Sequence, residues 1–150
     1  MPMLSLSEAL DMRDCPGAAT VVSGIELDSR QVTEGDLFLA IPGEIHDGRQ
    51  FIEQAVASGA VAVAAEPPVA GFVEALPVPL VEVPDLQQES GFIAARLHSH
   101  PAASLHMVGV TGTNGKTTTS RLVAQLLRQR GRSCGVIGTC LLYTSPSPRD

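Results

Sequence analysis

Short apolar runs, each closed by residues that favour turns, recur through the first hundred residues of the chain. The clearest run covers residues 37–41, and Pro42 and Gly43 follow it directly. A continuous apolar run of this length is typical of a strand buried on both faces of a sheet. The sequence predicts three further strands, at residues 25–29, 60–65 and 78–83.

Between these runs the apolar positions change to a helical spacing. Apolar residues at 51, 52, 55 and 56 predict a helix over residues 51–58, which Gly59 is suited to end. Asp85 is suited to cap a helix over residues 85–97, and Ser5 and Glu8 have the spacing of a capping box. Strands and helices that alternate in this order predict an α/β domain with a largely parallel sheet.

The alternation restarts after a short segment that we interpret as a linker. We predict a first domain over residues 1–100, a linker over 101–104 and the beginning of a second domain over 105–140. In the second domain we expect, in order, a strand at 105–110, a Gly- and Thr-rich turn, a helix from 116 to about 130, Gly131 as its end, and a strand at 134–137.

The charge distribution follows the same division. Residues 1–100 hold 15 acidic side chains and four arginines, whereas residues 101–150 hold six basic side chains and one acidic side chain. The second part is therefore better suited to polyanions such as nucleotide phosphates. Aromatic residues make up only 3% of the chain, so it lacks the stacking surface of a nucleic-acid binder, and we expect no nucleic-acid partner.

Composition also indicates the compartment. No apolar run reaches the roughly 18 residues that span a bilayer, so we expect no membrane insertion. The start of the chain lacks a basic segment followed by a long apolar stretch, and we see no secretory signal. Cys15, Cys134 and Cys140 show no C-x-x-C spacing, which favours free thiols over a disulfide or a metal site. We therefore expect a cytoplasmic location. Separately, we expect the protein to be a monomer.

The strongest chemical signal lies between the predicted strand at 105–110 and the helix that follows. The segment Gly112-Thr-Asn-Gly-Lys-Thr-Thr118 has the context of a phosphate-binding loop. Its glycines let backbone N–H groups turn toward an anion, and the helix start adds further unpaired N–H groups. Lys116, the only lysine in the sequence, would pair with the β- and γ-phosphates of ATP, and the Thr117 hydroxyl would ligate Mg²⁺.

The loop departs from the general pattern G-x-x-x-x-G-K-[ST], because Val110 stands where that pattern has glycine. The string GTNGKTT instead resembles the phosphate loop of the Mur ligase and folylpolyglutamate synthetase group, in which Gly112 opens the loop. With the preceding Gly109-Val-Thr111 it is most similar to the Mur ligases. The resemblance implies that ATP is bound by Gly112, Thr113, Asn114, Gly115, Lys116, Thr117 and Thr118, with Lys116 as the catalytic residue.

The first domain resembles the uridine-nucleotide domain of the same family. The similar strings are Leu27-Asp-Ser-Arg30, Gly35-Asp-Leu-Phe-Leu-Ala-Ile-Pro-Gly43 and His46-Asp-Gly-Arg49, followed by the Ala-x-x-x-Gly-Ala pattern that ends at Ala60. The resemblance covers roughly residues 20 to 140. It implies a uridine-nucleotide-binding α/β domain followed by the start of a P-loop (Rossmann-like) ATPase domain.

For the substrate, the resemblance implies contacts to the uridine part from Leu27 and Ser29. Glu44, Ile45 and His46 match the segment that lies along the UDP moiety. For Arg30 and Arg49 two interpretations stay open. Each guanidinium suits a phosphate of the substrate, and each also has an aspartate two residues earlier, Asp28 or Asp47, as an ion-pair candidate. The histidines at 98, 100 and 106 receive no role.

The function that the resemblance implies is an ATP-dependent ligase of peptidoglycan synthesis. Such an enzyme adds the third amino acid, diaminopimelate or L-lysine, to UDP-N-acetylmuramoyl-L-alanyl-D-glutamate, with ATP and Mg²⁺ as cofactors. Three alternatives are the ligase that adds D-alanyl-D-alanine, a non-catalytic nucleotide-binding fragment and an unrelated P-loop NTPase. The first domain argues against the last of these. Asp-Ser-Arg and Asp-Gly-Arg are more similar to the ligase for the third amino acid.

The last ten residues depart from the family pattern. The sequence follows the family as far as Gly138-Thr139, whereas residues 141–150 resemble a read-through tail more than a protein segment. We therefore expect a non-native tail without assigned structure there. We also expect the 150-residue chain alone to be inactive as a ligase, because the family has a longer central domain and a third domain.

Overall fold

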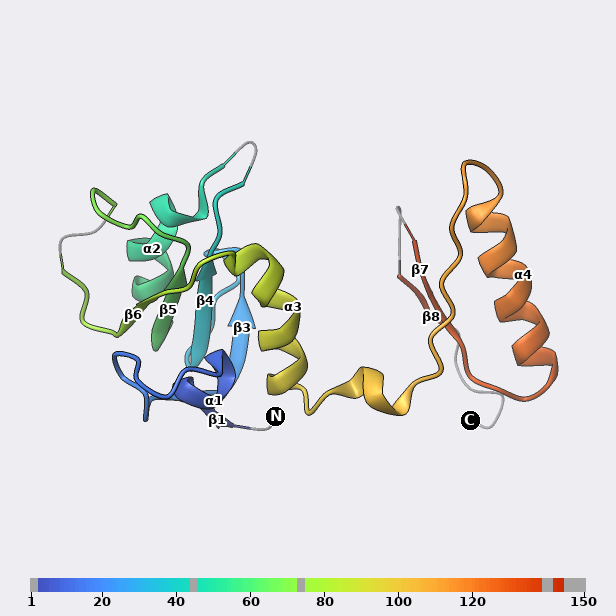
Figure 1. Cartoon of the computed structure of the whole chain (residues 1–150), viewed down its shortest axis with the longest axis horizontal. Helices are drawn as coiled ribbons and strands as arrows, with labels where there is room; N and C mark the ends of the chain where they lie inside the picture. Colours follow the sequence, from blue (N-terminus) through green and yellow to red (C-terminus); the bar gives the residue numbers. More distant parts are fainter. Residues whose placement is uncertain (1–2, 44–45, 73–74, 139–141, 145–150) are drawn as a thin grey trace. The chain divides into compact units, whose positions relative to one another are not determined.

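The structure is a computed structural model that describes residues 3–43, 46–72, 75–138 and 142–144 (Figure 1). The chain divides into two compact units, Met1–Leu105 and His106–Asp150. The first holds β1 (Leu4–Ser5), α1 (Leu6–Leu10), β2 (Val21–Val22), β3 (Gly24–Glu26), β4 (Asp36–Ala40), the 3₁₀ helix η1 (Gly48–Phe51), α2 (Ile52–Ala57), β5 (Ala62–Ala65), β6 (Leu80–Glu82), α3 (Leu86–Leu97) and the 3₁₀ helix η2 (Pro101–Ser104). The second holds α4 (Lys116–Gln129), β7 (Gly135–Ile137) and β8 (Leu142–Thr144).

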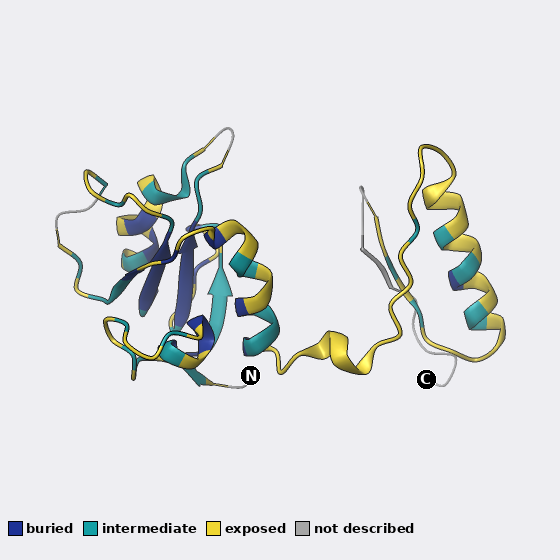
Figure 2. Ribbon diagram, viewed as in Figure 1, coloured by how far each residue is buried: buried dark blue, intermediate teal, exposed yellow. Residues whose placement is uncertain are grey.

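The first unit is built on a parallel sheet with the strand order β3-β4-β5-β6. β4 is buried along its whole length because successive side chains point to opposite faces and both faces are covered. Leu37 and Leu39 join the core that α1 and α3 cover, whereas Phe38 and Ala40 join the core that α2 covers. Figure 2 shows these buried strands between the more exposed helices. The predicted α/β fold is confirmed.

Most predicted elements of the first unit form, with shifted ends. The strand predicted at 25–29 ends at Glu26, because the Glu26 carboxylate accepts hydrogen bonds from the N–H groups of Leu27 and Asp28 and turns the backbone out of the sheet. The helix predicted at 51–58 begins earlier, as η1, and continues as α2. The short strands β1 and β2, which pair in antiparallel fashion, were not predicted, because two residues show no periodicity.

The two predicted helix caps have different outcomes. The capping box before α1 is confirmed: the Ser5 hydroxyl accepts from the N–H of Glu8 at 3.3 Å, and the Glu8 carboxylate accepts from the N–H of Ser5 at 2.9 Å. The prediction for Asp85 is wrong in its chemistry. Asp85 precedes α3 in a left-handed conformation, with φ of 52°, and its carbonyl rather than its carboxylate accepts from Gln88 and Glu89.

In the second unit, α4 and β7 form as predicted, but the strand predicted at 105–110 does not. Residues 105–110 have the apolar pattern of a strand, yet none of the described residues forms a ladder with them, and a strand exists only through such pairing. β7 pairs instead with β8 in antiparallel fashion. β8 lies within residues 141–150, the segment to which the sequence assigned no structure.

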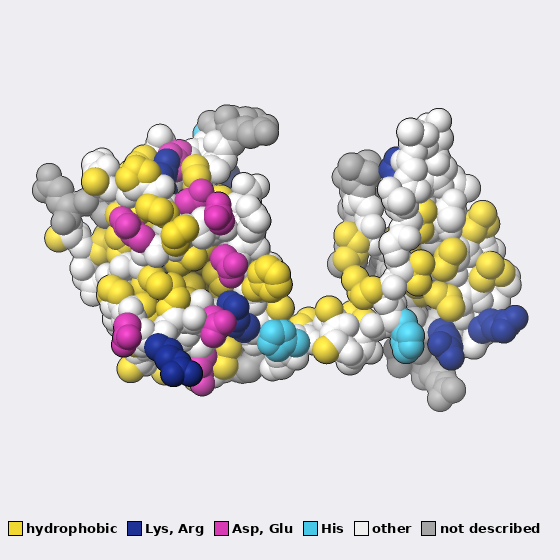
Figure 3. All heavy atoms as spheres, in the orientation of Figure 1, with side chains coloured by type: hydrophobic (Ala, Val, Ile, Leu, Met, Phe, Trp, Pro, Cys, Tyr) yellow, Lys and Arg dark blue, Asp and Glu magenta, His cyan; other side chains and the backbone are white. Residues whose placement is uncertain are grey.

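Apolar side chains remain exposed in the second unit. Leu122 and Leu126 on α4 are 54% and 62% exposed, and Ala124 is the only residue of α4 that is buried. Figure 3 shows apolar side chains on the visible face of this unit. Among the described residues, no helix combines the length and the apolar character needed to cross a membrane.

Candidate functional site

The predicted phosphate loop begins as an exposed turn whose glycines have backbone angles that other residues avoid. Gly112 has a φ of 143°, and Gly115, which immediately precedes α4, has a φ of 78°. A Cβ added at Gly115 would meet nothing within 4 Å, so packing does not require glycine at this position. The backbone angle does, and the missing Cβ also keeps the approach to the loop open.

The start of α4 offers unpaired backbone donors beside this turn. The first helical hydrogen bond runs from the N–H of Thr119 to the carbonyl of Gly115 at 2.9 Å, so the N–H groups of residues 116–118 precede the ladder. Among the described residues, no side chain caps this end. Exposed N–H groups and the positive end of the helix dipole together suit a phosphate group.

Lys116 folds back over the loop. Its Nζ donates to the carbonyl of Gly112 at 2.6 Å and to the carbonyl of Thr113 at 3.2 Å. The ammonium is thereby held against the turn. Thr117, the next residue in the chain, is exposed. This donor set fits the phosphates of a nucleotide. Within the described part of the chain, no group of three His, Cys, Asp or Glu residues could hold a metal ion.

The first unit places the other predicted residues at the carboxyl ends of adjacent parallel strands. Leu27 and Ser29 follow β3, and His46 follows β4. In open α/β sheets, ligands bind at this edge. Leu27 is 54% exposed and available to a ligand, whereas Ser29 is buried. Glu44 and Ile45 lie outside the described residues.

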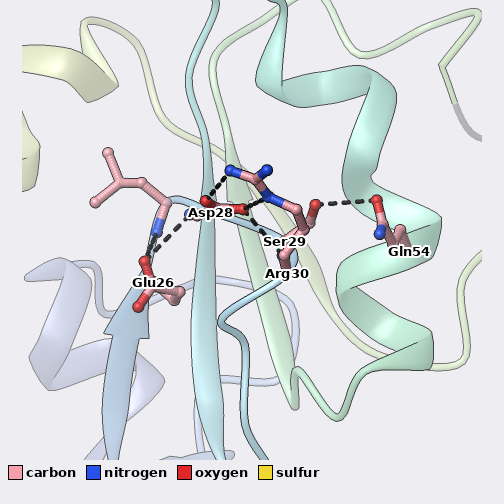
Figure 4. A network of polar contacts seen from close by, with 6 residues as sticks. Glu26, Asp28, Ser29, Arg30 and Gln54 are labelled. Atoms are coloured by element: carbon pink, nitrogen blue, oxygen red, sulfur yellow. Dashed lines mark hydrogen bonds and ion pairs between the residues drawn. The ribbon is translucent and has the colours of Figure 1, made fainter.

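The loop after β3 is held by a network of polar contacts (Figure 4). The Ser29 hydroxyl donates to Oε1 of Gln54 on α2 at 3.0 Å. The Glu26 carboxylate accepts from the N–H of Leu27 at 2.9 Å and from that of Asp28 at 3.2 Å. The network fixes the backbone of the loop from which Leu27 projects. Gln54 was not singled out from the sequence, because its position on an amphipathic helix looks like that of any exposed glutamine.

Both arginines pair with the nearby aspartate, which is one of the two interpretations that the sequence left open. Arg30 Nη2 lies 2.6 Å from Asp28 Oδ2, and Arg49 Nη2 lies 2.7 Å from Asp47 Oδ2. The two pairs differ in exposure: the Arg30 side chain is 79% exposed, and the Arg49 side chain is 14% exposed. Arg49 is therefore part of the protein's own framework, whereas Arg30 faces solvent.

Each pair favours the charged form of its carboxylate. Hydrogen bonds from the side chain and the backbone N–H of Arg30 lower the pKa of Asp28 strongly. Hydrogen bonding to the Arg49 side chain likewise lowers the pKa of Asp47, against a smaller opposing effect of burial. Both aspartates are thus ionised at neutral pH, and the two arginine charges are locally balanced.

Comparison with known proteins identifies the family. Residues 21–98 match the family described as "Mur ligase family, catalytic domain", and residues 110–149 match the "Mur ligase middle domain". The chain belongs to the Mur ligase family.

The curated relatives carry one activity in their names. The chain is 47% identical over 122 residues to the UDP-N-acetylmuramoyl-L-alanyl-D-glutamate--2,6-diaminopimelate ligase of Ectopseudomonas mendocina, covering 81% of this chain and 25% of the relative. It is 44% identical over 118 residues to the ligase of that name from Geobacillus thermodenitrificans, covering 79% of this chain and 23% of the relative. This Mur ligase chain therefore spans about a quarter of the length of these relatives.

Solved structures agree with this assignment. A structure of UDP-N-acetylmuramoyl-L-alanyl-D-glutamate--2,6-diaminopimelate ligase matches with a TM-score of 0.78 and 32% identity, over 97% of this chain and 30% of that one. The MurF ligase from Thermotoga maritima in complex with ADP matches with a TM-score of 0.54 and 29% identity, over 73% of this chain and 24% of that one. The Mur ligase fold thus extends to a relative that binds ADP.

Proposed function

We propose that this chain is part of an ATP-dependent ligase that joins 2,6-diaminopimelate to UDP-N-acetylmuramoyl-L-alanyl-D-glutamate in peptidoglycan synthesis. One observation carries the proposal: an exposed phosphate loop with Lys116 held over it follows a domain that matches relatives of that name. We assign residues 1–100 to substrate binding and residues 105–140 to ATP binding, with 101–104 as the linker. ATP as substrate supports a cytoplasmic location.

In the proposed site, the chain's residues bind and orient the phosphates. Lys116 exchanges its contacts with the carbonyls of Gly112 and Thr113 for the β- and γ-phosphates, and the N–H groups at the start of α4 bind the same anion. Thr117 would hold Mg²⁺, which would offset phosphate charge. The substrate ATP would transfer its γ-phosphoryl group to the glutamate carboxylate with release of ADP, and attack by the amine would then release phosphate and leave the amide. The positive charge of Lys116 stabilises the negative charge on the transferring group.

For the UDP substrate we propose contacts from Leu27, Ser29, Glu44, Ile45 and His46. The exposed Leu27 provides an apolar surface for the uracil ring. The Ser29 hydroxyl donates a hydrogen bond to Gln54, so its oxygen remains able to accept one. We propose that Arg30, rather than Arg49, is the arginine available to a phosphate of this substrate, because its side chain faces solvent.

The test compares Lys116→Ala with the unchanged protein in two assays. In the 150-residue chain, we expect Lys116→Ala to weaken ATP binding by about 10- to 100-fold, since a hydrogen bond to a charged group contributes about 1.5–3 kcal/mol. The same change should also be made in a ligase of the relatives' full length that contains this segment. There it should abolish ATP-dependent amide formation. Unchanged turnover there would refute the assignment of the loop.

A second candidate is the ligase that adds D-alanyl-D-alanine. It is supported by the similarity to a UDP-N-acetylmuramoylalanyl-D-glutamyl-2,6-diaminopimelate--D-alanyl-D-alanyl ligase from Acinetobacter baumannii, with a TM-score of 0.63 and 25% identity over 86% of this chain and 29% of that one. Both values are lower than those for the diaminopimelate ligase structure. A ligation assay on the same full-length ligase decides between the two. It compares amide formation with diaminopimelate and with D-alanyl-D-alanine, each supplied with its matching UDP precursor.

A further inference from the structure

Arg49 connects two segments at the carboxyl end of the sheet, the base of the loop after β4 and the segment after β5. Its Nε donates to Asp47 Oδ1 at 2.9 Å, and its Nη2 donates to Oδ2 of the same carboxylate at 2.7 Å. Its Nη1 donates to the backbone carbonyls of Glu66 at 3.3 Å and Pro68 at 3.1 Å. The guanidinium carbon lies 4.6 Å from the ring centroid of Phe72. All three guanidinium nitrogens are therefore engaged by the protein itself.

Asp47, the main partner of Arg49, stands at the base of the loop that follows β4. Asp47 forms an isolated antiparallel bridge with Pro42. Around this bridge, the N–H of Gly43 donates to the carbonyl of His46 at 3.1 Å, and the N–H of Gly48 donates to the carbonyl of Ile41 at 3.0 Å. The Asp47 carboxylate also caps η1 by accepting from the N–H of Arg49 at 3.0 Å.

The other partners of Arg49 belong to the segment that follows β5. Glu66, Pro68 and Phe72 come after the end of this strand, which pairs with β4 in parallel. Along the chain, the loop after β4 is followed directly by η1 and α2 (Figure 1). One side chain therefore fixes the base of the β4 loop against its neighbour. Lysine could not do so, because a single ammonium cannot bind a carboxylate in two places and two carbonyls at once.

We propose that Arg49 is a positioning residue for the UDP site: it holds the base of the loop after β4 in the geometry that presents His46 to the substrate, without touching the substrate itself. This proposal rests on the proposed function, in which His46 lies along the UDP moiety. His46 is also in edge contact with Phe51 of η1, with ring centroids 6.5 Å apart, so a displaced η1 would carry His46 with it.

The matched control is Arg96, which uses the same chemistry elsewhere in the first unit. Arg96 on α3 donates to the carbonyl of Ala9 at 3.2 Å and to the Asp11 carboxylate at 3.5 Å, and its side chain is 22% exposed. It lies on the helix layer that covers the opposite face of the sheet from α2. Arg49→Lys and Arg96→Lys each remove a guanidinium that contacts both a backbone carbonyl and an aspartate, but only Arg49 lies beside the candidate site.

The experiment measures UDP binding by calorimetry, thermal unfolding and amide hydrogen exchange on the 150-residue chain and both variants. We expect Arg49→Lys to weaken UDP binding at least about tenfold and to speed exchange at Gly43 and Gly48, while Arg96→Lys changes neither. If Arg49→Lys leaves the exchange rates at these two amides unchanged, the positioning role is overturned. Equal losses of UDP affinity in the two variants overturn it as well, because general destabilisation then explains both.

The failure of the proposed function has a different signature. If the unchanged chain does not bind UDP, the proposed function of the first unit is wrong, and the positioning proposal falls with it. If the unchanged chain binds UDP and Arg49→Lys binds it equally well, only the positioning proposal is wrong.

Discussion

The hydroxyl of Ser29 donates a hydrogen bond of 3.0 Å to Oε1 of Gln54, joining the loop after β3 to α2. Because Ser29 is buried, loss of its partner leaves a polar group without compensation, which costs about 1–3 kcal/mol. We expect Gln54→Leu to lower the free energy of unfolding by about 1–2 kcal/mol. In a urea-unfolding double-mutant cycle, adding Ser29→Ala should recover part of the loss; strictly additive effects would show that this hydrogen bond is not the cause.

Glycine at position 115 is expected to matter for the ligand more than for the fold. Gly115→Ala places a Cβ at a φ of 78°, which costs about 1–2 kcal/mol, and it also obstructs the approach of a phosphate. Gly131, after the other end of α4, has a φ of 72° and equally open surroundings, so Gly131→Ala is the matched control. Both variants should lose similar stability in thermal unfolding, but only Gly115→Ala should lose ATP affinity. Equal ATP affinities would argue against the loop as the binding site.

Two consecutive residues that follow α3 have an unfavourable backbone conformation. Ser99 and His100 have φ values of 57° and 53°, which cost a residue with a Cβ more than they cost glycine. We expect Ser99→Gly and His100→Gly each to raise the free energy of unfolding by about 0.5–1 kcal/mol, after subtraction of the greater freedom of glycine in the unfolded chain. Gln88→Gly, in the first turn of α3, should instead lower it by about 0.5–1 kcal/mol. Thermal unfolding of the three variants checks both signs.

Because both faces of β4 are covered, truncating one of its side chains should lower the stability of the first unit. Phe38 is fully buried against α2, so Phe38→Ala should cost about 3–5 kcal/mol. Leu126 on α4 is 62% exposed, and Leu126→Ala should change stability by less than about 0.5 kcal/mol. Chemical unfolding followed by circular dichroism measures both. A small effect of Phe38→Ala would contradict the packing described here.

Acid should destabilise the first unit through its paired aspartates. The folded pKa of Asp47 is lowered from its ordinary value of 3.8, so its stabilisation is complete above that value and is lost as the pH falls through the lower folded pKa. Asp28 acts in the same direction. We expect Asp47→Asn to reduce the loss of stability between about pH 4 and pH 2 without removing it. Urea unfolding across this range tests the prediction, and an unchanged pH dependence would contradict it.

The sequence by itself determined the α/β class and the main elements of the first unit, because the physical signals are local. The apolar run at 37–41 is typical of a covered strand and includes most of β4, and the spacing of Ser5 and Glu8 is the spacing of the capping box that forms. The string GTNGKTT similarly predicted where the glycines of an exposed turn stand before a helix. Each of these signals depends on residues within a few positions of one another.

Only the tertiary structure decided the rest, because it depends on partners distant in the sequence. Arg49 donates hydrogen bonds to Asp47 and to carbonyls 17 and 19 residues away. The sequence alone could not distinguish an arginine with these partners from one that binds a phosphate. Gln54 meets Ser29 across 25 residues without any local pattern. Residues 105–110 show the complementary case: their apolar pattern suits a strand, but a strand forms only where a neighbouring chain segment supplies the hydrogen bonds.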